Sequence, residues 1–359
     1  MNDVHFLDYA STSPIVRFPI DATTQWCNPN AAYAYEERKL LMDCEDRIKA
    51  AIGAKDGHVL YFRCATDAIE WLYSKIVNEA VSPFDRWWAH SPYEHDCCLL
   101  GDECMPSNTY PMDFYCHQLV NHITGEIFNI ATIRQQLDDA REMIAAPYLF
   151  CDCTAAIHHI SLRAAKVCQY ADCICMSGHK LGCPDIAFMW IDDRLFEWLG
   201  GGKDIRNQWG LKHGSLSVGH VLALTGAVEW ACDSKRLNDM NNWCIRLFDY
   251  LCCELKKADI DFSVIADMKP STCAINAIRL NGLNADSLQS YLASNGIYIG
   301  VGHSSCSANA DYRILRNFGL TDIEASEVIR VSFGEETTSK DVDVLVKNIC
   351  EYKKVFLIN

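Results

Sequence analysis

The sequence predicts an α/β protein that consists of a large domain with a mostly parallel β-sheet and a smaller α+β domain. Strand-like and helix-like runs alternate through the first part of the chain, which is typical of a sheet whose strands are joined by crossover helices. The chain has 359 residues, 50% of them hydrophobic, which is enough to bury the cores of two domains. It shows no internal repeat and no low-complexity tract, so we expect no disordered linker.

Apolar runs predict the strands, and longer periodic runs predict the helices. In the large domain the predicted strands are residues 58–63, 86–91, 112–119, 147–151, 171–176 and 186–191, and the predicted helices are 66–78 and 133–145. A helical stretch at about 218–257 would link the domains. In the small domain we expect strands at 272–280, 296–301 and 328–332, a helix near 285–294 and a terminal helix from 339. Residues 15–240 would then form the large domain, and 1–14 with 241–359 the small one.

The charge balance excludes some classes of function. Lysine and arginine number 32 against 47 aspartates and glutamates, which gives a net charge of −15. An acidic chain without a long basic run is a poor candidate for direct binding to nucleic acid. No apolar run approaches the about 18 residues of a membrane span, and Met1-Asn2-Asp3 lacks the basic segment that opens a secretion signal. We therefore expect a soluble, cytoplasmic protein without membrane contact.

The cysteines are numerous, 20 in all, but their spacing does not indicate a metal site. Zinc and iron–sulfur sites usually need paired ligands such as Cys-x-x-Cys, which the chain lacks, and a disulfide scaffold belongs to short secreted chains. In strands, Cys151 with Cys153 and Cys173 with Cys175 would each place two thiols on one face, as small buried apolar residues. We expect most cysteines in the core, and no metal.

A lysine and an aspartate follow two of the predicted strands. Lys180 closes the turn Ser177-Gly178-His179-Lys180 after the strand at 171–176, and Asp152 ends the strand at 147–151. Their separation of 28 residues (180 − 152) suits one crossover helix between neighbouring parallel strands. An amine and a carboxylate at one sheet edge are what a pyridoxal phosphate (PLP) site needs, one to bind the aldehyde and one to keep the pyridine nitrogen protonated. The same pair also arises by chance in many α/β proteins.

Segments along almost the whole chain resemble the class V aminotransferases and, within them, the cysteine desulfurases. The matched segments come in the family's order: residues 6–14 (FLDYASTSP) resemble its opening YLDNAATTP, 28–29 its GNPSS, 64–68 (CATDA) its GATEA, 94–95 its EH, 152–155 (DCTA) its DATQ, 177–180 its SGHK, 200–202 with 212–215 (KHGS) its GGG…RSGT, 302–307 (GHSSCS) its SGSAC(S/T), and 329–334 (IRVSFG) its IRISLG. So many motifs in the right order are specific, although any one alone would not be.

The resemblance implies a PLP-dependent transferase of fold type I that acts as a homodimer. It would convert L-cysteine to L-alanine and pass the sulfur to an acceptor protein. Lys180 would hold the cofactor and take the Cα proton of the substrate, Asp152 would keep the ring nitrogen protonated, and His95 would stack on the ring. Cys306 would attack the substrate sulfur and carry it as a persulfide. Ser215 would reach the cofactor phosphate of the other subunit.

Further residues fit this site by their chemistry. Ala65 and Thr66 open a predicted helix, whose first N–H groups could bind the cofactor phosphate, and Thr66 is equally suited to be an ordinary N-cap. Ser177 and His179 add a hydroxyl and an imidazole beside the lysine. Arg330 lies between apolar residues in a strand, where its fork suits a substrate carboxylate, and an internal ion pair is the alternative.

Two regions leave alternatives open. By residue type, Asn121 takes the place of a family asparagine at the cofactor and substrate, whereas counting back from Gly125 favours His122. Cys306 lies in a run of small polar residues that predicts an exposed loop, where an incidental cysteine is the alternative. His303 could assist it as an acid or be a surface histidine.

The chain also departs from the family pattern. Ala155 stands where the family usually has a glutamine that donates to the cofactor's phenolic oxygen, and Cys64 replaces a glycine. A selenocysteine lyase, or another class V enzyme with a different substrate, is therefore the second hypothesis. A non-catalytic partner protein of the same fold is the third, disfavoured because Asp152, Lys180, His179 and Arg330 are all present.

Overall fold

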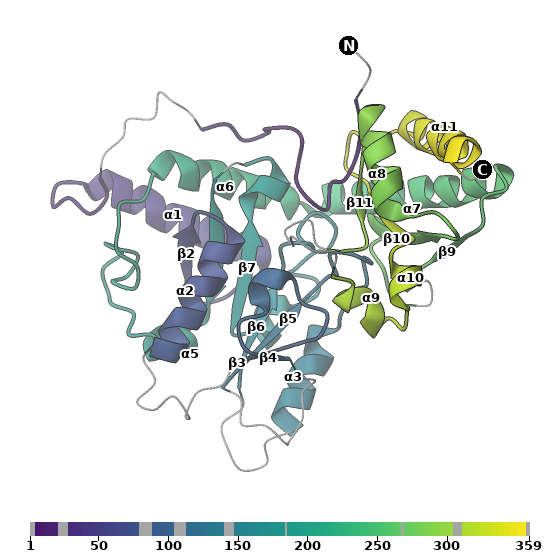
Figure 1. Cartoon of the computed structure of the whole chain (residues 1–359). Helices are drawn as coiled ribbons and strands as arrows, with labels where there is room; N and C mark the ends of the chain where they lie inside the picture. Colours follow the sequence, from purple (N-terminus) through teal and green to yellow (C-terminus); the bar gives the residue numbers. More distant parts are fainter. Residues whose placement is uncertain are drawn as a thin grey trace. The chain divides into compact units, whose positions relative to one another are not determined.

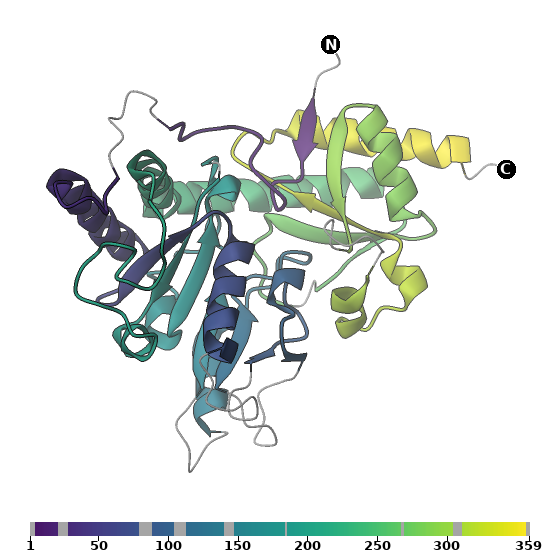
Figure 2. The same ribbon diagram turned by 60° about the vertical axis from the view of Figure 1, so that its left-hand side comes forward.

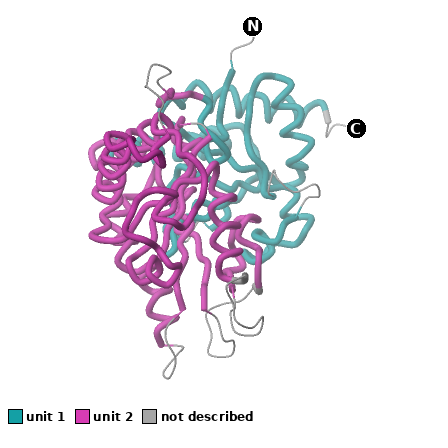
Figure 3. The backbone as a smooth tube through the Cα atoms, turned by 90° about the vertical axis from the view of Figure 1, so that its left-hand side faces the viewer, with its two compact units in different colours: residues 1–14, 120–128, 238–359 teal, residues 15–119, 129–237 magenta. Residues whose placement is uncertain are grey.

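The computed structural model describes residues 4–20, 28–78, 88–103, 113–139, 147–183, 185–266, 269–303 and 311–356. The chain divides into two compact units, coloured separately in Figure 3. Unit 1 comprises Met1–Pro14, Val120–Phe128 and Asn238–Asn359, and unit 2 comprises Ile15–Leu119 and Asn129–Leu237. Among the described residues, no helix is both long and apolar enough to cross a lipid bilayer.

Unit 2 is built on a seven-stranded sheet with the order β2-β8-β7-β6-β5-β3-β4. Its strands are β2 (His58–Phe62), β3 (Trp88–His90), β4 (Asp102–Glu103), β5 (Phe114–Gln118), β6 (Tyr148–Asp152), β7 (Cys173–Ser177) and β8 (Ala187–Ile191). The pairings from β7 through β6, β5 and β3 to β4 are parallel, whereas β8 runs antiparallel to both of its neighbours, β2 and β7. The predicted α/β class with a mostly parallel sheet is confirmed.

Helices cover this sheet. They are α1 (Tyr35–Ile52), α2 (Ala65–Asn78), α3 (Ile130–Asp139), α4 (Val167–Tyr170), α5 (Asp193–Trp198) and α6 (Val218–Ala231), with two short 3-10 turns, η1 (Asp96–Cys98) and η2 (Gly178–Leu181). Helix α2 packs across β7 and β8 (Figure 1). It buries Ile69, Leu72 and Ile76, which share a core cluster with alternate residues of the strands. Cys173 and Cys175 belong to that cluster. They act as small apolar core residues, because alternate residues of a strand face the same side.

Unit 1 has a five-stranded sheet with the order β1-β11-β12-β10-β9. Its elements are β1 (His5–Leu7), β9 (Phe262–Val264), β10 (Ile275–Leu280), β11 (Ile297–Val301), β12 (Val328–Ser332), α8 (Ala285–Ser294), α9 (Arg313–Asn317), α10 (Asp322–Ala325) and α11 (Ser339–Phe356), together with most of α7 (Ser234–Lys257). Strand β1 pairs with β11 in parallel and the other pairings are antiparallel. Helices α8 and α11 pack against each other, as Figure 2 shows.

The structure differs from the sequence-based expectation in two places that concern the division into domains. The stretch expected to be helical from 218 to 257 is two helices, because the Asp233 carboxylate accepts from the N–H of Arg236 at 2.8 Å and so starts a new helix, α7. Residues 120–128, which the sequence assigned to the large domain, belong to unit 1. There Ile127 N–H donates to Pro270 O at 2.8 Å and Thr272 N–H to Gly125 O at 3.1 Å.

Candidate active site

The carboxyl ends of β6 and β7 lie side by side in unit 2. The two strands pair in parallel with Asp152 opposite Cys175, so the aspartate and the residues that follow β7 share one edge of the sheet. Asp152 is buried, and its Oδ1 accepts from the N–H of Thr154 at 2.8 Å. This contact orients the carboxylate.

Lys180 lies in η2, the turn that directly follows β7. The turn is tight, since a Cβ at Gly178 would lie 2.7 Å from Ile186 O and 2.9 Å from Cys183 O, so only glycine fits there. The neighbouring His179 is affected by the lysine: burial, followed by the positive charge of Lys180, lowers the pKa of His179 to about 4. At neutral pH His179 is therefore an uncharged imidazole beside the amine.

His95 is the third residue in the region of Asp152 and Lys180. It precedes η1, where its Nδ1 accepts from the N–H of Cys97 at 3.3 Å and lies 3.1 Å from the Cys97 thiol. The charges of Lys180 and Asp152 both act on its imidazole. The structure thus brings together three residues that the sequence predicted for the ring of the cofactor.

The predicted phosphate residues begin at the N-terminus of α2. Ala65 and Thr66 are its first two residues, where backbone N–H groups lack intrahelical partners and favour an anion. Ser177, at the end of β7, is 3% exposed. Lys212 donates to Asp67 Oδ2 and to Tyr61 O, both at 3.3 Å, and so ties the loop before α6 to the start of α2.

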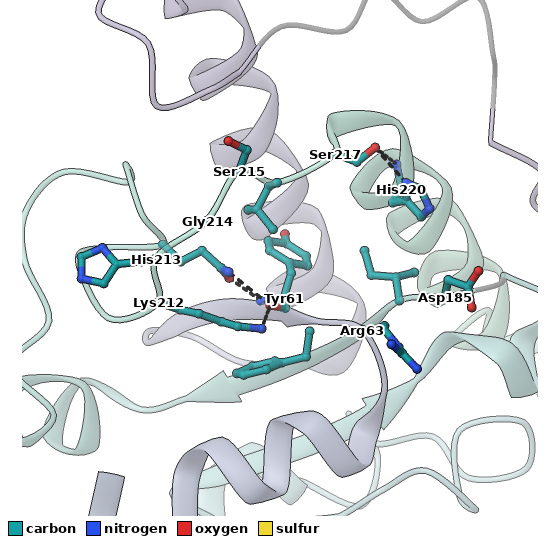
Figure 4. Close-up of a pocket in the computed structure, with 13 residues that line it drawn as sticks. Tyr61, Arg63, Asp185, Lys212, His213, Gly214, Ser215, Ser217 and His220 are labelled. Carbon is teal, nitrogen blue, oxygen red and sulfur yellow. Dashed lines mark hydrogen bonds between the residues drawn. The ribbon is translucent and has the colours of Figure 1, made fainter. Parts of the chain in front are cut away.

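Ser215 lines a pocket of about 260 Å³ in unit 2. Figure 4 shows the basic side chains of Arg63, Lys212 and His213 around it, with Ser217 hydrogen-bonded to His220. Asp185 is the acidic group in its lining. The pocket therefore has the chemistry of an anion site, formed in part by the loop at residues 212–217.

One buried hydroxyl in this region tests whether the residues fit a cofactor. Thr154, two residues after Asp152, is buried, and its Oγ1 has no hydrogen-bond partner among the described residues. A buried hydroxyl without a partner costs about 1–3 kcal/mol, so such a group indicates a missing ligand. PLP carries a phenolic oxygen on the ring whose nitrogen Asp152 would hold, and the side chain of Ala155 has no donor to offer it. The residues present therefore fit PLP.

Asn121 and Arg330 form a separate polar cluster within unit 1. Arg330 donates to Asp8 Oδ1 at 2.8 Å, to Ser11 Oγ at 2.6 Å and to the carbonyl of His122 at 3.0 Å. The internal ion pair that the sequence left open is thus present. Gly300 makes room for it, because a Cβ there would lie 2.7 Å from Arg330 Nε.

Asn121 and His122 take different roles in that cluster. The Asn121 side-chain oxygen accepts from Ile123 and Thr124 N–H at 2.9 and 3.0 Å, and its Nδ2 is buried with no partner among the described residues. His122 contributes its carbonyl to Arg330. The side-chain amide of Asn121 is therefore available for a ligand.

Cys306 lies outside the described residues. Its described neighbour His303 pairs with Asp286, Nε2 to Oδ1 at 2.9 Å, and its ring meets Tyr312 edge-on at 5.7 Å. Both contacts hold the imidazole of His303.

Sequence reasoning gave no role to three groups in unit 2. Nothing in the sequence distinguished Thr154 apart from its place in the matched segment 152–155. Glu94, next to His95, is fully buried, and its Oε1 accepts from Gln118 N–H at 2.7 Å and from the Ser91 hydroxyl at 3.0 Å. His158 donates from Nε2 to the carbonyl of Lys180. The histidine pair at 158–159, soon after Asp152, was the signal that could have drawn attention to it.

Comparisons with known proteins agree with this geometry. The family model described as "Aminotransferase class-V" matches residues 113–345. A Halalkalibacterium halodurans protein named as a cysteine desulfurase of the NifS type is 21% identical over 373 residues, 95% of this chain and 96% of that protein. The cysteine desulfurase IscS of Shewanella frigidimarina is 27% identical over 202 residues, 54% of this chain and 46% of that protein.

Solved structures share the fold. A NifS-like protein from Rickettsia africae superposes with a TM-score of 0.81 at 15% identity, covering 98% of this chain and 100% of that one. A cysteine desulfurase from Thermococcus onnurineus, solved in its apo form, gives a TM-score of 0.76 at 15% identity, covering 98% of this chain and 95% of that one.

Replacing Thr154 should separate stability from cofactor affinity. Thr154→Val removes an unsatisfied buried hydroxyl, so we expect the cofactor-free protein to melt at the same or a higher temperature while its Kd for PLP rises about tenfold. Thr154→Ser should keep the affinity. Thr225→Val is the control, since the Thr225 hydroxyl already donates to Val221 O at 2.8 Å. It should lose stability and keep PLP affinity. An unchanged Kd in Thr154→Val would contradict the prediction.

The stability of the protein should fall with rising pH because of Glu94. Burial, with the charge of Asp152 contributing, raises the pKa of Glu94 from 4.5 to about 8. The folded state keeps a proton that the unfolded state loses, so the stabilisation is full below about pH 4.5 and is lost as the pH rises through about 8. Relative to Glu94→Gln, the wild type should lose a few kcal/mol, on the order of 1.4 per pKa unit, between about pH 5 and 8 in denaturant unfolding.

Glu229→Gln provides the control for that experiment. Glu229 is paired with Arg47 at 2.7 Å, and this hydrogen bond lowers the pKa of the carboxyl. Its contribution is therefore complete throughout the same pH window. If wild type and Glu94→Gln show parallel pH profiles, the interpretation of Glu94 is wrong.

Proposed function

The chain belongs to the aminotransferase class-V family, and from this premise we propose that it is a PLP-dependent cysteine desulfurase that converts L-cysteine to L-alanine. One observation carries the proposal. Asp152 and Lys180 follow adjacent parallel strands, and the charges of both act on His95. The combination of amine, buried acid and imidazole suits a pyridine ring with an aldehyde.

Residues of unit 2 would hold the cofactor. Asp152 would bind the ring nitrogen, His95 would stack on the ring, and the start of α2 with Ser177 would bind the phosphate. When bound, PLP supplies an aldehyde that combines with amines and a ring that accepts electrons from the substrate's Cα. Lys180 would take the Cα proton, the role that the resemblance to the family gives to its amine.

Arg330 would bind the carboxylate of the substrate. Its guanidinium is buried, and its Nε has no partner among the described residues. The NH2 group contacts Asp8 and Ser11, so a carboxylate would share the guanidinium with Asp8. The free amide of Asn121 would provide a second donor to the same cofactor and substrate.

Cys306 would receive the sulfur. Its thiolate would attack the substrate sulfur, the bond between that sulfur and the substrate Cβ would break, and the electron pair would return to the carbon fragment. Cysteine and the Cys306 thiol then give alanine and the Cys306 persulfide, so the step needs no external oxidant or reductant. An acceptor protein with a free thiol would remove the sulfur by exchange.

We propose that the enzyme is a homodimer. Tyr33 and Tyr35 before and at the start of α1 are 78% and 72% exposed, which is unusual for large side chains. Asn30 joins them to the loop of Ser215, since Asn30 Nδ2 donates to Gly214 O at 3.2 Å. The segment before α1 thus contacts the loop of Ser215, which supports a second copy of the chain, with a phosphate near Ser215, as the partner of both.

An assay of alanine release tests the proposed activity. With L-cysteine as substrate, we expect wild type to release alanine and to carry a persulfide on Cys306. Cys306→Ala should lose turnover by orders of magnitude while still binding PLP, and Lys180→Ala should lose both turnover and the covalent cofactor. Cys253→Ala, which removes an exposed thiol on α7, is the matched control. Activity on selenocysteine alone, or full activity of Cys306→Ala, would favour a different class V enzyme.

Arg330→Lys should weaken binding of the substrate. A lysine cannot hold a carboxylate with two parallel hydrogen bonds, so we expect the KM for L-cysteine to rise about tenfold or more. The absorbance of bound PLP should stay the same. If KM is unchanged while the protein melts at a lower temperature, Arg330 serves only its ion pair with Asp8.

A further inference from the structure

The carbonyl of Lys180 is held by a side chain from another part of unit 2. Within the turn, the carbonyls of Gly178 and His179 accept from the N–H groups of Cys183 and Gly182, at 3.0 and 3.3 Å. The carbonyl of Lys180 instead accepts from Nε2 of His158, 22 residues away. The peptide that carries the lysine side chain is therefore fixed from outside the turn.

The partners of His158 determine which nitrogen carries its proton. A guanidinium only donates, and Arg236 NH2 lies 3.1 Å from Nδ1, so Nδ1 must accept. A carbonyl only accepts, so Nε2 must carry the proton that it donates to Lys180. Burial and the charges of Arg236 and Arg17 lower the pKa of His158 to about 4. The hydrogen bond to the carbonyl of Lys180 acts in the opposite direction and only partly offsets them. The imidazole is thus neutral, as this arrangement requires.

Arg236 is itself held in place. Its guanidinium carbon lies 3.7 Å from the centre of the Trp230 ring, and its NH1 donates to the carbonyl of His158 at 3.5 Å. The rings of His158 and Trp230 meet edge-on at 5.7 Å. Arg236 is in the first turn of α7, and Trp230 is near the end of α6, which packs against η2.

We propose that His158 is a positioning residue for Lys180, and that Arg236 acts through His158 by keeping it in the donating tautomer. A lysine side chain has four rotatable methylenes, so the place of its amine depends on how firmly its peptide is held. This proposal rests on the proposed function, because it assigns the amine of Lys180 to the cofactor. It adds two residues, His158 and Arg236, that touch neither cofactor nor substrate.

The test measures the covalent link between cofactor and lysine. Cofactor-free protein is titrated with PLP, the complex is reduced with borohydride, and mass spectrometry gives the fraction of bound PLP attached to Lys180. In His158→Ala we expect the Kd for PLP to rise about tenfold and the attached fraction to fall at least twofold, as for the loss of one buried hydrogen bond. His158→Gln keeps an N–H at the place of Nε2 and should stay within about threefold of the wild-type Kd.

Variants of Arg236 test whether this residue acts on Lys180 through His158. Arg236→Gln leaves His158 in place and should give an intermediate Kd, and the double variant with His158→Ala should be no worse than His158→Ala alone. Arg47→Gln, which removes a pair with Glu229 on α1 and α6, is the matched control and should behave as wild type. Additive effects in the double variant would overturn the role of Arg236.

The outcomes distinguish this proposal from the proposed function. A wild-type Kd and wild-type attachment in His158→Ala would overturn the positioning role, even if the wild type releases alanine. Conversely, a wild type that attaches PLP at Lys180 but releases no alanine from cysteine would contradict the proposed function alone. If His158→Ala does not fold, the variants His158→Gln and Arg236→Gln decide. Weak attachment of PLP in Arg236→Gln, with normal attachment in His158→Gln, supports the proposal. Normal attachment in Arg236→Gln, with weak attachment in His158→Gln, overturns it.

Discussion

The parallel pairing of β6 with β7 is the constraint on which the candidate site depends. Both strands end at the same edge of the sheet, so the acid at the end of one and the amine just after the other meet without any contribution from distant loops. The turn after β7 is fixed by its own close packing, since Ile186 and Cys183 leave no space for a side chain at Gly178. The other groups of the site, His95 and the start of α2, are placed by strands and helices of the same sheet.

Burial gives these groups their chemical character. The same low-dielectric surroundings keep His158 and His179 neutral and favour the protonated form of Glu94. Each buried polar atom then needs a partner of matching type. The partners of Glu94 and His158 come from the protein, whereas the hydroxyl of Thr154 and the amide of Asn121 have none among the described residues, as we expect of groups that meet a cofactor or a substrate.

The sequence was sufficient to predict the large sheet and the positions of Asp152 and Lys180 at its edge. Short continuous apolar runs mark the ends of β6 and β7, and the residues after those ends follow directly. It was insufficient for contacts made across the fold. Arg330 pairs with Asp8 over 322 positions and His158 reaches Lys180 over 22, and no local pattern encodes either contact. The break between α6 and α7 was missed for another reason, since one capping aspartate outweighed a continuous helical pattern.

The sheet of unit 1 cannot form completely until β11 has been synthesised. Its first strand, β1, pairs with β11, His5 opposite Ile297, so the ribosome adds about 290 residues (297 − 5) between the two. At about 5–20 residues per second, roughly 15 to 60 seconds pass before the N-terminal strand finds its neighbour. All of unit 2 emerges in that interval. The growing chain must therefore keep an unpaired β-edge out of aggregates until β11 has been synthesised, a task that suits a chaperone at the ribosomal exit.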